Sequence, residues 1–260
     1  MDPLSPLITA LHGEGRLRVW SLVITVFGDM VQHRGGGIST ARLGRLLGRV
    51  GVEPGALRTA LSRLGRDGWV TSARSGRLSI YRLSPDGLLQ FAPATTQIYA
   101  APRLHPATSW ALSVTLSASG EPVTALHPLD TAPEEADCQV TGTLSHISEA
   151  FRRRSLSAPH RAALSALSAD LEALSSASLP PLEAAAARVL LTHRWRRIVL
   201  RFPEIPFELM PADAPLANPR AAVAQAYQSL TPEAEAWLDT SAGDASPMPA
   251  ASPSAFLRFG

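Results

Sequence analysis

The sequence has no lysine, a single cysteine and no long apolar run. Since Cys138 has no second cysteine to pair with, an intrachain disulfide and a cysteine-rich metal site are excluded, and we expect a buried, unreactive thiol. The longest apolar run, Leu22–Phe27, is much too short to span a bilayer. Residues 1–7 lack the basic start and apolar stretch of a signal peptide, so we expect a cytoplasmic protein with no membrane partner.

Signatures of catalysis are missing as well. The seven histidines show neither HxH nor HExxH spacing, no GxSxG motif occurs, and Gly35–Gly37 is not followed by the lysine of a phosphate-binding loop. A metal-dependent nuclease would need a carboxylate at the end of the first strand of the middle region, and residues 110–120 contain none. We therefore expect a protein that is not an enzyme and that has no catalytic residue, metal or cofactor.

The charges are unevenly placed along the chain. All 24 basic side chains are arginines; residues 1–84 contain 12 of them against 5 acidic residues, a net charge of +7. The remainder has 12 arginines against 17 acidic residues, a net charge of −5. A basic front on an acidic body is typical of a protein with a nucleic-acid-binding module.

Composition and periodicity predict an α+β protein in which helices predominate. Residues 1–91 combine helical periodicity with a short hairpin, and residues 92–147 contain prolines and strand-like runs. Residues 148–240 are rich in alanine and leucine and read as a helical domain, and residues 241–260 read as a flexible tail. We expect these four ranges to be the domains and the tail.

The basic front has the pattern of a winged helix-turn-helix. A first helix extends to about Gln32 and is broken by Gly35–Gly37, after which Ser39 or Thr40 can cap a second helix that ends near Arg49. Pro54–Arg66 predicts a third helix, because Leu57, Ala60, Leu61 and Leu64 recur at steps of three and four. The segments 69–74 and 78–83 then alternate as a hairpin. Short helices followed by a hairpin indicate a winged domain.

Such a domain would bind double-stranded DNA, with Pro54–Arg66 as the reading helix in the major groove. The hairpin would place arginines on the flanking backbone or in the minor groove, and the second helix would meet phosphates with its N-terminus. The candidate DNA contacts are Ser39, Thr40, Arg42, Arg58, Thr59, Ser62, Arg63, Arg66, Arg74 and Arg77. The alternative is a solvated arginine face on an ordinary small domain. The charge of +7 together with the helix and hairpin pattern favours DNA.

The same residues resemble a known family. The strings are SLVITVFGD at Ser21–Asp29, RGG at Arg34–Gly36, LRTALSRLGRDGW at Leu57–Trp69 and GRLSIYRLS at Gly76–Ser84. In this order and spacing they resemble the N-terminal domain of the PaaX-like regulators, named for the repressor of phenylacetic acid degradation. The segment Ala187–Pro215 resembles the C-terminal signature of that family, although Ala214 stands where a tryptophan is typical.

The resemblance implies a fold for the middle region and a function. Residues 92–147 would hold a small, shortened ferredoxin-like module, of which Trp110–Leu116, Pro122–Ala125 and Cys138–Leu144 read as strands. The chain would be a homodimeric regulator, most often a repressor, of aromatic-acid catabolism genes. An aryl-CoA or similar acyl-CoA effector would release it from its promoter operator. A ligand-independent architectural DNA-binding protein is the alternative that the sequence leaves open.

A cluster of basic side chains is the candidate effector site. His193, Arg197 and Arg201 recur at steps of four and share one helix face. Arginines bind phosphates through paired hydrogen bonds, and a CoA thioester carries phosphates. The cluster consists of His193, Arg194, Arg196, Arg197 and Arg201. The alternative is that these side chains pair with nearby acids such as Glu204 and Glu208, or are solvated.

Overall fold

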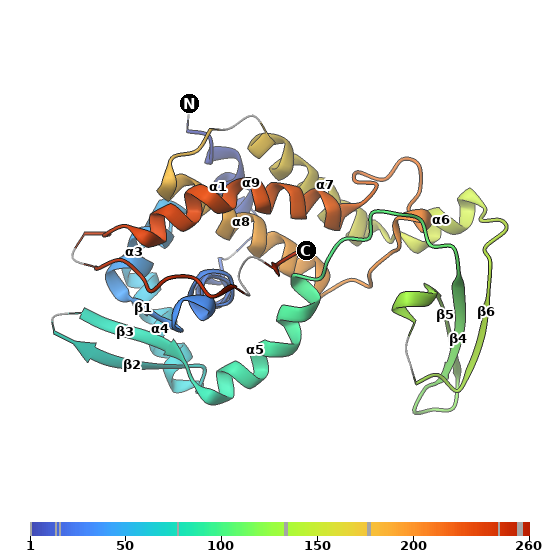
Figure 1. The fold of residues 1–260 in the computed structure, drawn as a ribbon, viewed down its shortest axis with the longest axis horizontal. Helices are drawn as coiled ribbons and strands as arrows, with labels where there is room; N and C mark the ends of the chain where they lie inside the picture. Colours follow the sequence, from blue (N-terminus) through green and yellow to red (C-terminus); the bar gives the residue numbers. More distant parts are fainter. Residues whose placement is uncertain are drawn as a thin grey trace.

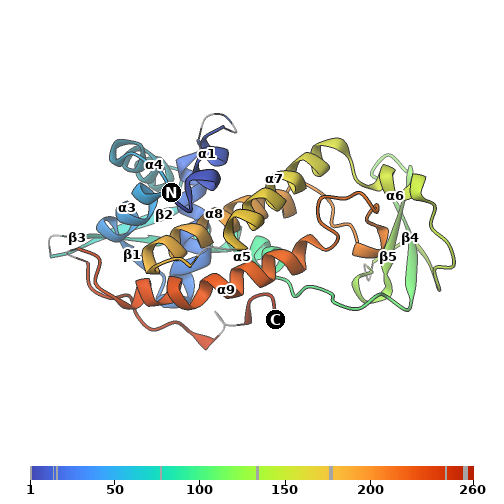
Figure 2. The ribbon, with the colours of Figure 1, turned by 90° about the horizontal axis from the view of Figure 1, so that it is seen from above.

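The computed structural model describes residues 2–13, 15, 17–76, 78–132, 135–175, 178–243, 245–253 and 257–260. Two three-stranded antiparallel sheets lie at opposite ends of an elongated helical body (Figure 1). Seen from above, the long helices lie between the two sheets (Figure 2). These are α7 (Ala158–Ser175), α8 (Pro181–Val199) and α9 (Pro219–Asp239). The expected α+β class, with helices in the majority, is confirmed.

In the part of the chain that the structure describes, the front of the molecule contains four α-helices and one sheet. Strand β3 lies between β1 and β2 in this sheet. Helix α2 continues directly into a π-helical turn, Phe27–Val31, and then a 3-10 turn, Gln32–Arg34. The elements are α1 (Ser5–Gly13), α2 (Val19–Val26), β1 (Gly37–Ser39), α3 (Thr40–Arg49), α4 (Pro54–Arg66), β2 (Val70–Ser75) and β3 (Leu78–Leu83).

Local chemistry explains where α3 and α4 begin. The Ser39 hydroxyl accepts a hydrogen bond from the Arg42 backbone N–H at 3.2 Å, which caps α3. Gly51 has a φ of +84°, a left-handed conformation that turns the chain between the two helices. Pro54 occupies the first turn of α4, where its missing N–H costs nothing. The predicted bounds of both helices are confirmed.

Helix α8 lies in the middle of the core. All ten residues from Ala184 to His193 are buried, so this helix is covered on every side. Four consecutive alanines, Ala184–Ala187, let neighbouring helices approach closely, and α9 is the main neighbour of α8. Side chains of α2, α3, α8 and α9 belong to one continuous buried cluster. The basic front and the helical body therefore share a core.

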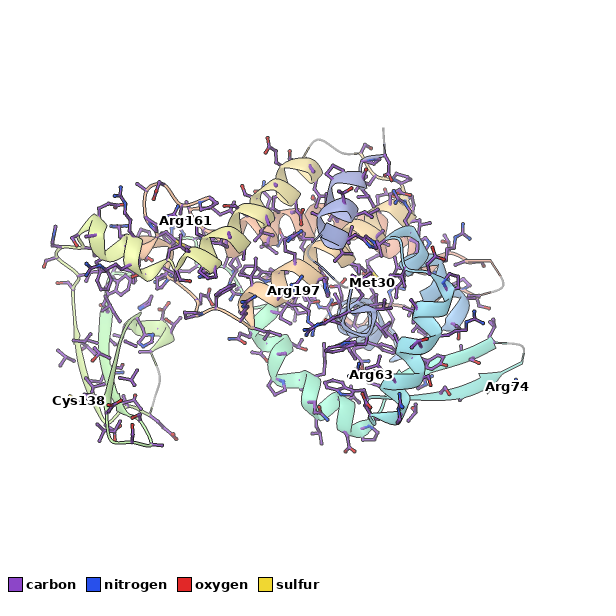
Figure 3. The ribbon with its side chains drawn as sticks, turned by 180° about the vertical axis from the view of Figure 1, so that it is seen from behind. Met30, Arg63, Arg74, Cys138, Arg161 and Arg197 are labelled. Atoms are coloured by element: carbon purple, nitrogen blue, oxygen red, sulfur yellow. The ribbon has the colours of Figure 1, made fainter. Side chains whose placement is uncertain are left out.

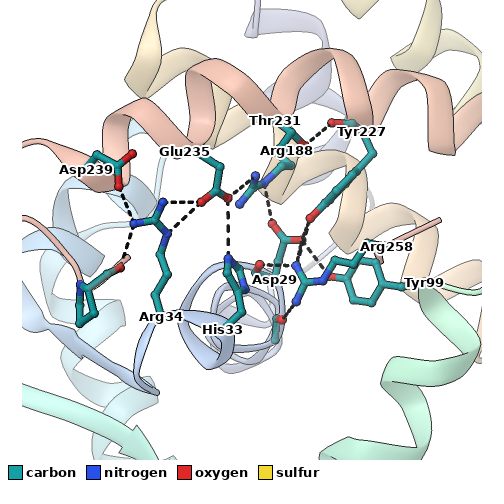
Figure 4. A network of polar contacts seen from close by, with 12 residues as sticks. Asp29, His33, Arg34, Tyr99, Arg188, Tyr227, Thr231, Glu235, Asp239 and Arg258 are labelled. Atoms are coloured by element: carbon teal, nitrogen blue, oxygen red, sulfur yellow. Dashed lines mark hydrogen bonds and ion pairs between the residues drawn. The ribbon is translucent and has the colours of Figure 1, made fainter. Parts of the chain in front are cut away.

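A buried network of ion pairs joins the π-helical turn to α8 and α9 (Figure 4). The fully buried Arg188 donates from Nε to Asp29 at 2.9 Å and from Nη1 to Glu235 at 2.7 Å. Arg34 reaches the other oxygen of Glu235 at 2.6 Å. Asp29 also accepts hydrogen bonds from the hydroxyls of Tyr99 and Tyr227, at 2.8 and 3.0 Å. Burial raises the pKa of Tyr227 to about 12, so it stays a donor.

Residues after α9, which the sequence suggested to be flexible, make contacts with this network. The Arg258 guanidinium donates to the Gly28 carbonyl at 2.7 Å and lies 4.3 Å from the centre of the Tyr99 ring. Met248 and Phe259 are buried, and the Ser252 N–H donates to the His33 carbonyl at 2.7 Å. The described C-terminal residues thus cover the π-helical turn.

Helix α5 (Pro85–Ile98) leaves the front sheet, and the chain then crosses to the second sheet. That sheet has the order β5-β4-β6. Its strands are β4 (Trp110–Leu116), β5 (Pro122–Pro128) and β6 (Cys138–Gly142), so the expected strand over Trp110–Leu116 is confirmed. The described residues between β5 and β6 include one 3-10 turn, Leu129–Thr131. Helix α6 (Glu149–Ser155) leads back to the body.

One face of the second sheet is apolar and exposed. Register places Leu112 between Leu126 and Val140, and Val114 between Thr124 and Cys138, with their side chains on the same face. Leu112 and Val140 are 43% and 62% exposed. The expectation of a buried thiol is wrong, because Cys138 lies on edge strand β6 and is exposed. Among the described helices, none has the length and apolarity needed to cross a membrane.

We predict that the buried network contributes strongly to stability. Replacing Arg188 by Gln leaves Asp29 and Glu235 without their shared cation, and should lower the free energy of unfolding by about 3–5 kcal/mol. Urea denaturation followed by circular dichroism measures this loss. Arg153 forms an exposed pair with Glu149 at 3.6 Å, so Arg153→Gln should cost less than about 0.5 kcal/mol. Equal effects of the two changes would contradict the prediction.

Candidate functional site

Helix α4 has the buried apolar face and the exposed polar face that the sequence predicts. Leu57, Ala60, Leu61 and Leu64 are buried, and α4 packs against α2. The opposite face exposes all five predicted contacts: Arg58, Thr59, Ser62, Arg63 and Arg66. The Arg63 side chain is 62% exposed, and its Nε lies 3.4 Å from the Asp67 carboxylate one turn later. Five polar side chains, three of them cationic, are therefore available to a partner.

The hairpin of β2 and β3 extends beyond α4 (Figure 3). Arg74 is exposed and lies at the tip of this hairpin, where Gly76 adopts a left-handed φ of +60°. Arg77, the second arginine expected at the tip, lies outside the described residues. Ser84 follows β3 and caps α5 by accepting a hydrogen bond from the Gly87 N–H at 2.9 Å. The hairpin therefore has a fixed base and an exposed basic tip.

The N-terminus of α3 is less accessible than expected. The Ser39 hydroxyl is buried in the cap of α3, and the half-buried Thr40 hydroxyl donates to the Ser79 carbonyl at 3.1 Å. Thr40 therefore connects the start of α3 to β3. In this conformation, a DNA contact that took either hydroxyl away from its present partner would break a hydrogen bond that stabilises the fold.

Arg42 is placed differently from the expectation. It is 1% exposed, and its guanidinium donates to the backbone carbonyls of Trp237, Thr240 and Ser246. It also lies 5.0 Å from the centre of the Trp237 ring. The carbonyls at the end of α9 lack helical partners and carry the negative end of the helix dipole, so they attract a cation. Arg42 fixes α3 to α9 and is not accessible to a phosphate. Arg45 is exposed on the same helix, and periodicity alone did not single it out.

Comparisons with known proteins identify the family of the chain. Residues 18–87 match the PaaX-like protein family, and residues 151–240 match the PaaX-like protein C-terminal domain. The chain is 29% identical over 285 aligned residues to the transcriptional repressor PaaX of Escherichia coli (strain K12). That alignment covers 92% of this chain and 89% of the relative.

The chain belongs to the PaaX-like protein family.

A solved structure supports the fold of this PaaX-like chain. An uncharacterized protein from Mycobacterium tuberculosis aligns with a TM-score of 0.50 and 18% identity, over 84% of this chain and 97% of the other. At that identity the likeness concerns the fold alone.

Side chains of the basic cluster on α8 contact other residues of the PaaX-like fold. His193 is buried with Nδ1 3.0 Å from the Thr25 hydroxyl, and Arg196 donates to the same hydroxyl at 3.0 Å. That hydroxyl gives its hydrogen to the Ser21 carbonyl, so we infer that His193 donates from Nδ1. Arg194 pairs with Asp170 on α7. Arg197 and Arg201 are exposed, and Arg201 lies 5.3 Å from the centre of the Phe202 ring.

Three residues of this cluster border a small cavity in the part of the chain that the structure describes. His193, Arg194 and Arg197 line a cavity of about 10 Å³, which is at the limit for a single water molecule. The acids considered as their partners pair elsewhere: Glu204 with Arg220 and Glu208 with Arg103, at 2.6 and 2.7 Å. A much larger cavity, of about 460 Å³, lies between the end of α8, the residues after α5 and the end of β5.

We predict a pH dependence from His193. Burial, together with the charges of Arg196, Arg197 and Arg194, lowers the pKa of His193 from 6.5 to about 3. Between these values the unfolded chain binds a proton here and the folded chain does not, so stability falls as the pH falls. His193→Gln should remove up to about 1.4 kcal/mol per pH unit of that loss in urea titrations. A wild-type profile for His193→Gln would refute the burial of a neutral imidazole.

Proposed function

We propose that this chain is a transcriptional repressor that binds operator DNA through a winged helix-turn-helix formed by residues 17–83. The observation that carries the proposal is the exposed face of α4, with three arginines and two hydroxyls and no acidic residue within Pro54–Arg66. The relative from Escherichia coli is named a transcriptional repressor, and it aligns over almost the full length of both chains. Family membership therefore agrees with the surface chemistry.

The docking mode follows from the shape of this surface. A helix fits the major groove of B-DNA, where an arginine fork can pair with the O6 and N7 of guanine. Arg58, Arg63 and Arg66 are the candidates for this readout, and Thr59 and Ser62 add hydroxyls for bases or phosphates. The tip of the β2–β3 hairpin, with Arg74, would lie on the backbone beside the reading helix. Helix α3 would position α4 from behind, through side chains such as Leu43 and Leu47 in the shared core.

The regulated genes and the effector belong to the same proposal. By family membership we propose genes of phenylacetate-type aromatic-acid catabolism and release of the operator by an aryl-CoA or related acyl compound. An architectural DNA-binding protein without a ligand is the second candidate, and it would bind DNA equally with and without such compounds. The cavity of about 460 Å³ favours the ligand-controlled repressor.

We predict distinct effects of two arginines on DNA binding. Arg63→Ala should weaken binding to the operator by about 1–3 kcal/mol and relax specificity at one position, because a base contact is lost. Arg74→Ala should weaken binding to all sequences alike and reduce the salt slope by about one. Fluorescence anisotropy with the DNA upstream of the protein's own gene measures both effects.

The control for these variants is Arg154→Ala, which removes an exposed arginine next to the second sheet. It should leave operator affinity within the error of the measurement. Unchanged affinity in both Arg63→Ala and Arg74→Ala would show that the docking orientation is wrong.

We propose further that the chain acts as a homodimer, since two-fold symmetric operators are read by two-fold symmetric proteins. The apolar face of the β5-β4-β6 sheet fits a second copy of the same face, because Leu112, Val114, Leu126 and Val140 lie on it without a charged side chain among its strand residues. Two such faces can stack as in a sandwich. A shortened ferredoxin-like identity for residues 92–147 stays a prediction, as do the domain bounds at 91, 147 and 240.

A charge on this face should prevent dimerisation. Light scattering should give the wild type twice the 27.6 kDa of one chain and Leu112→Glu the mass of one chain. Thr115→Glu places the same charge on the opposite face of β4 and should remain dimeric. A monomeric wild type at DNA-binding concentrations, or a dimeric Leu112→Glu variant, would contradict this interface.

A further inference from the structure

We infer that the 460 Å³ cavity at the end of α8 binds a flat aromatic acyl group, with its carbonyl oxygen on Arg103. This inference deepens the proposed function, because it assigns a site and a ligand chemistry to the proposed effector. Cavities of roughly 300–1,000 Å³ hold small organic ligands. The residues that surround this one come from both the helical body and the segments leading to the second sheet.

The walls of the cavity favour an aromatic ring. Trp195, Phe202 and Phe207 contribute large apolar surfaces, and the His160 ring stacks on Phe202 with the centroids 4.5 Å apart. Burial lowers the pKa of His160, so this stacked ring is uncharged near neutral pH. The Trp195 indole N–H donates to the Ile98 carbonyl at 2.9 Å, which fixes its ring. A flat ligand could stack on such walls without ordering them first.

Two arginines lie at the cavity, and their hydrogen bonding differs. Arg220 is satisfied: it makes two hydrogen bonds to Glu204, at 2.8 and 2.6 Å, and donates to the Gln97 and Ala100 carbonyls. Arg103 donates from Nη2 to Glu208 at 2.7 Å, but its Nη1 is buried and has no hydrogen-bond partner. A buried donor without an acceptor is costly, and a ligand oxygen would satisfy it.

The charge balance indicates what kind of oxygen the ligand presents. Glu208 neutralises Arg103, and Glu204 neutralises Arg220, so the cavity has no excess of positive charge from these pairs. A carbonyl oxygen is therefore sufficient, and a full negative charge is not required. Arg103 also borders an open groove of about 770 Å³ along Pro102–Ser109. The remainder of a larger molecule could extend from the aromatic acyl group into that groove.

Helix α5 connects this cavity to the hairpin. Gln97 lies at its C-terminal end and lines the cavity, and Ser84 caps its other end at the base of β3. Gly87, in the first turn, approaches the Trp69 carbonyl so closely that an added Cβ would lie 2.3 Å from that oxygen. A ligand that displaces the C-terminal end of α5 would therefore move the hairpin with it. The consequence is a change in DNA affinity on ligand binding.

Isothermal titration calorimetry on the full chain tests the site without DNA. The probes are phenylacetate, phenylacetyl-CoA and CoA alone. Heat with either aromatic probe, and none with CoA alone, supports the site. If phenylacetate alone binds, the ligand is the free acid. If only phenylacetyl-CoA binds, the remainder of the thioester occupies the groove along Pro102–Ser109. No heat with either aromatic probe overturns the inference.

Three variants locate the site. Arg103→Met removes the unsatisfied donor and should weaken binding about tenfold or more. Thr131→Trp fills the cavity from its exposed rim and should abolish binding without disturbing the core. Arg201→Met changes an exposed arginine of the sequence-predicted cluster that does not line this cavity, and should bind as the wild type does. Circular dichroism and Tm verify that each variant is folded.

The outcomes separate the site from the repressor function. Full affinity in folded Arg103→Met and Thr131→Trp variants overturns the site, and loss of affinity in Arg201→Met assigns the ligand to the α8 cluster instead. Operator binding by the ligand-free protein is measured separately by anisotropy. If the ligand-free protein does not bind the operator, the proposed repressor function is refuted, whatever the calorimetry gives. If the ligand releases the operator from the wild type but not from Thr131→Trp, the result supports the coupling through α5.

Discussion

The structure depends on one buried cation. The Arg188 guanidinium, in the most buried part of α8, is neutralised by Asp29 from the π-helical turn and by Glu235 from α9. Removing three charges from water is expensive, and only close geometry with further hydrogen bonds compensates for it. Those hydrogen bonds come from Tyr99, Tyr227, Arg34 and Arg258. Residues from the front, the helical body and the C-terminal segment are thereby required to assemble together.

The network also gives a physical role to the strings that carry the family resemblance. In SLVITVFGD, Asp29 supplies the buried carboxylate, and Gly28 lets the Phe91 ring approach so closely that an added Cβ would lie 2.1 Å from it. In RGG, Arg34 reaches Glu235 and Asp239, and Gly35 and Gly36 adopt φ values of +78° and +72°. These two strings therefore supply residues that connect the front to the helical body, whereas LRTALSRLGRDGW contains most of the exposed helix α4.

The sequence predicted well those features that local chemistry determines. The bounds of α4, the cap of α3 and the strand Trp110–Leu116 followed from apolar periodicity, a Ser cap and alternation, all of which act within a few residues. Long-range contacts were not predicted. Arg42 occupies a polar position of α3, yet its partners are carbonyls nearly 200 residues later in the chain, and no local pattern marks them. Cys138 was misjudged because strand periodicity does not reveal which face of a sheet is covered.

Long-range contacts also reduce the part of the net charge of residues 1–84 that is accessible to a partner. Several of the 12 arginines in residues 1–84 are neutralised internally: Arg34 by Glu235, and Arg49 by Asp2 and Glu183. Arg42 is buried against backbone carbonyls. The charge of +7 therefore overstates what DNA would encounter on the whole front, but the exposed arginines of α4 and the hairpin tip remain concentrated on one surface. Because each phosphate contact contributes about −0.9 to the salt slope, few contacts give a modest electrostatic affinity. In the proposed binding mode, strong operator binding would then require base readout by α4 and the second half-site of the proposed dimer, so a ligand that shifts the hairpin would release the protein.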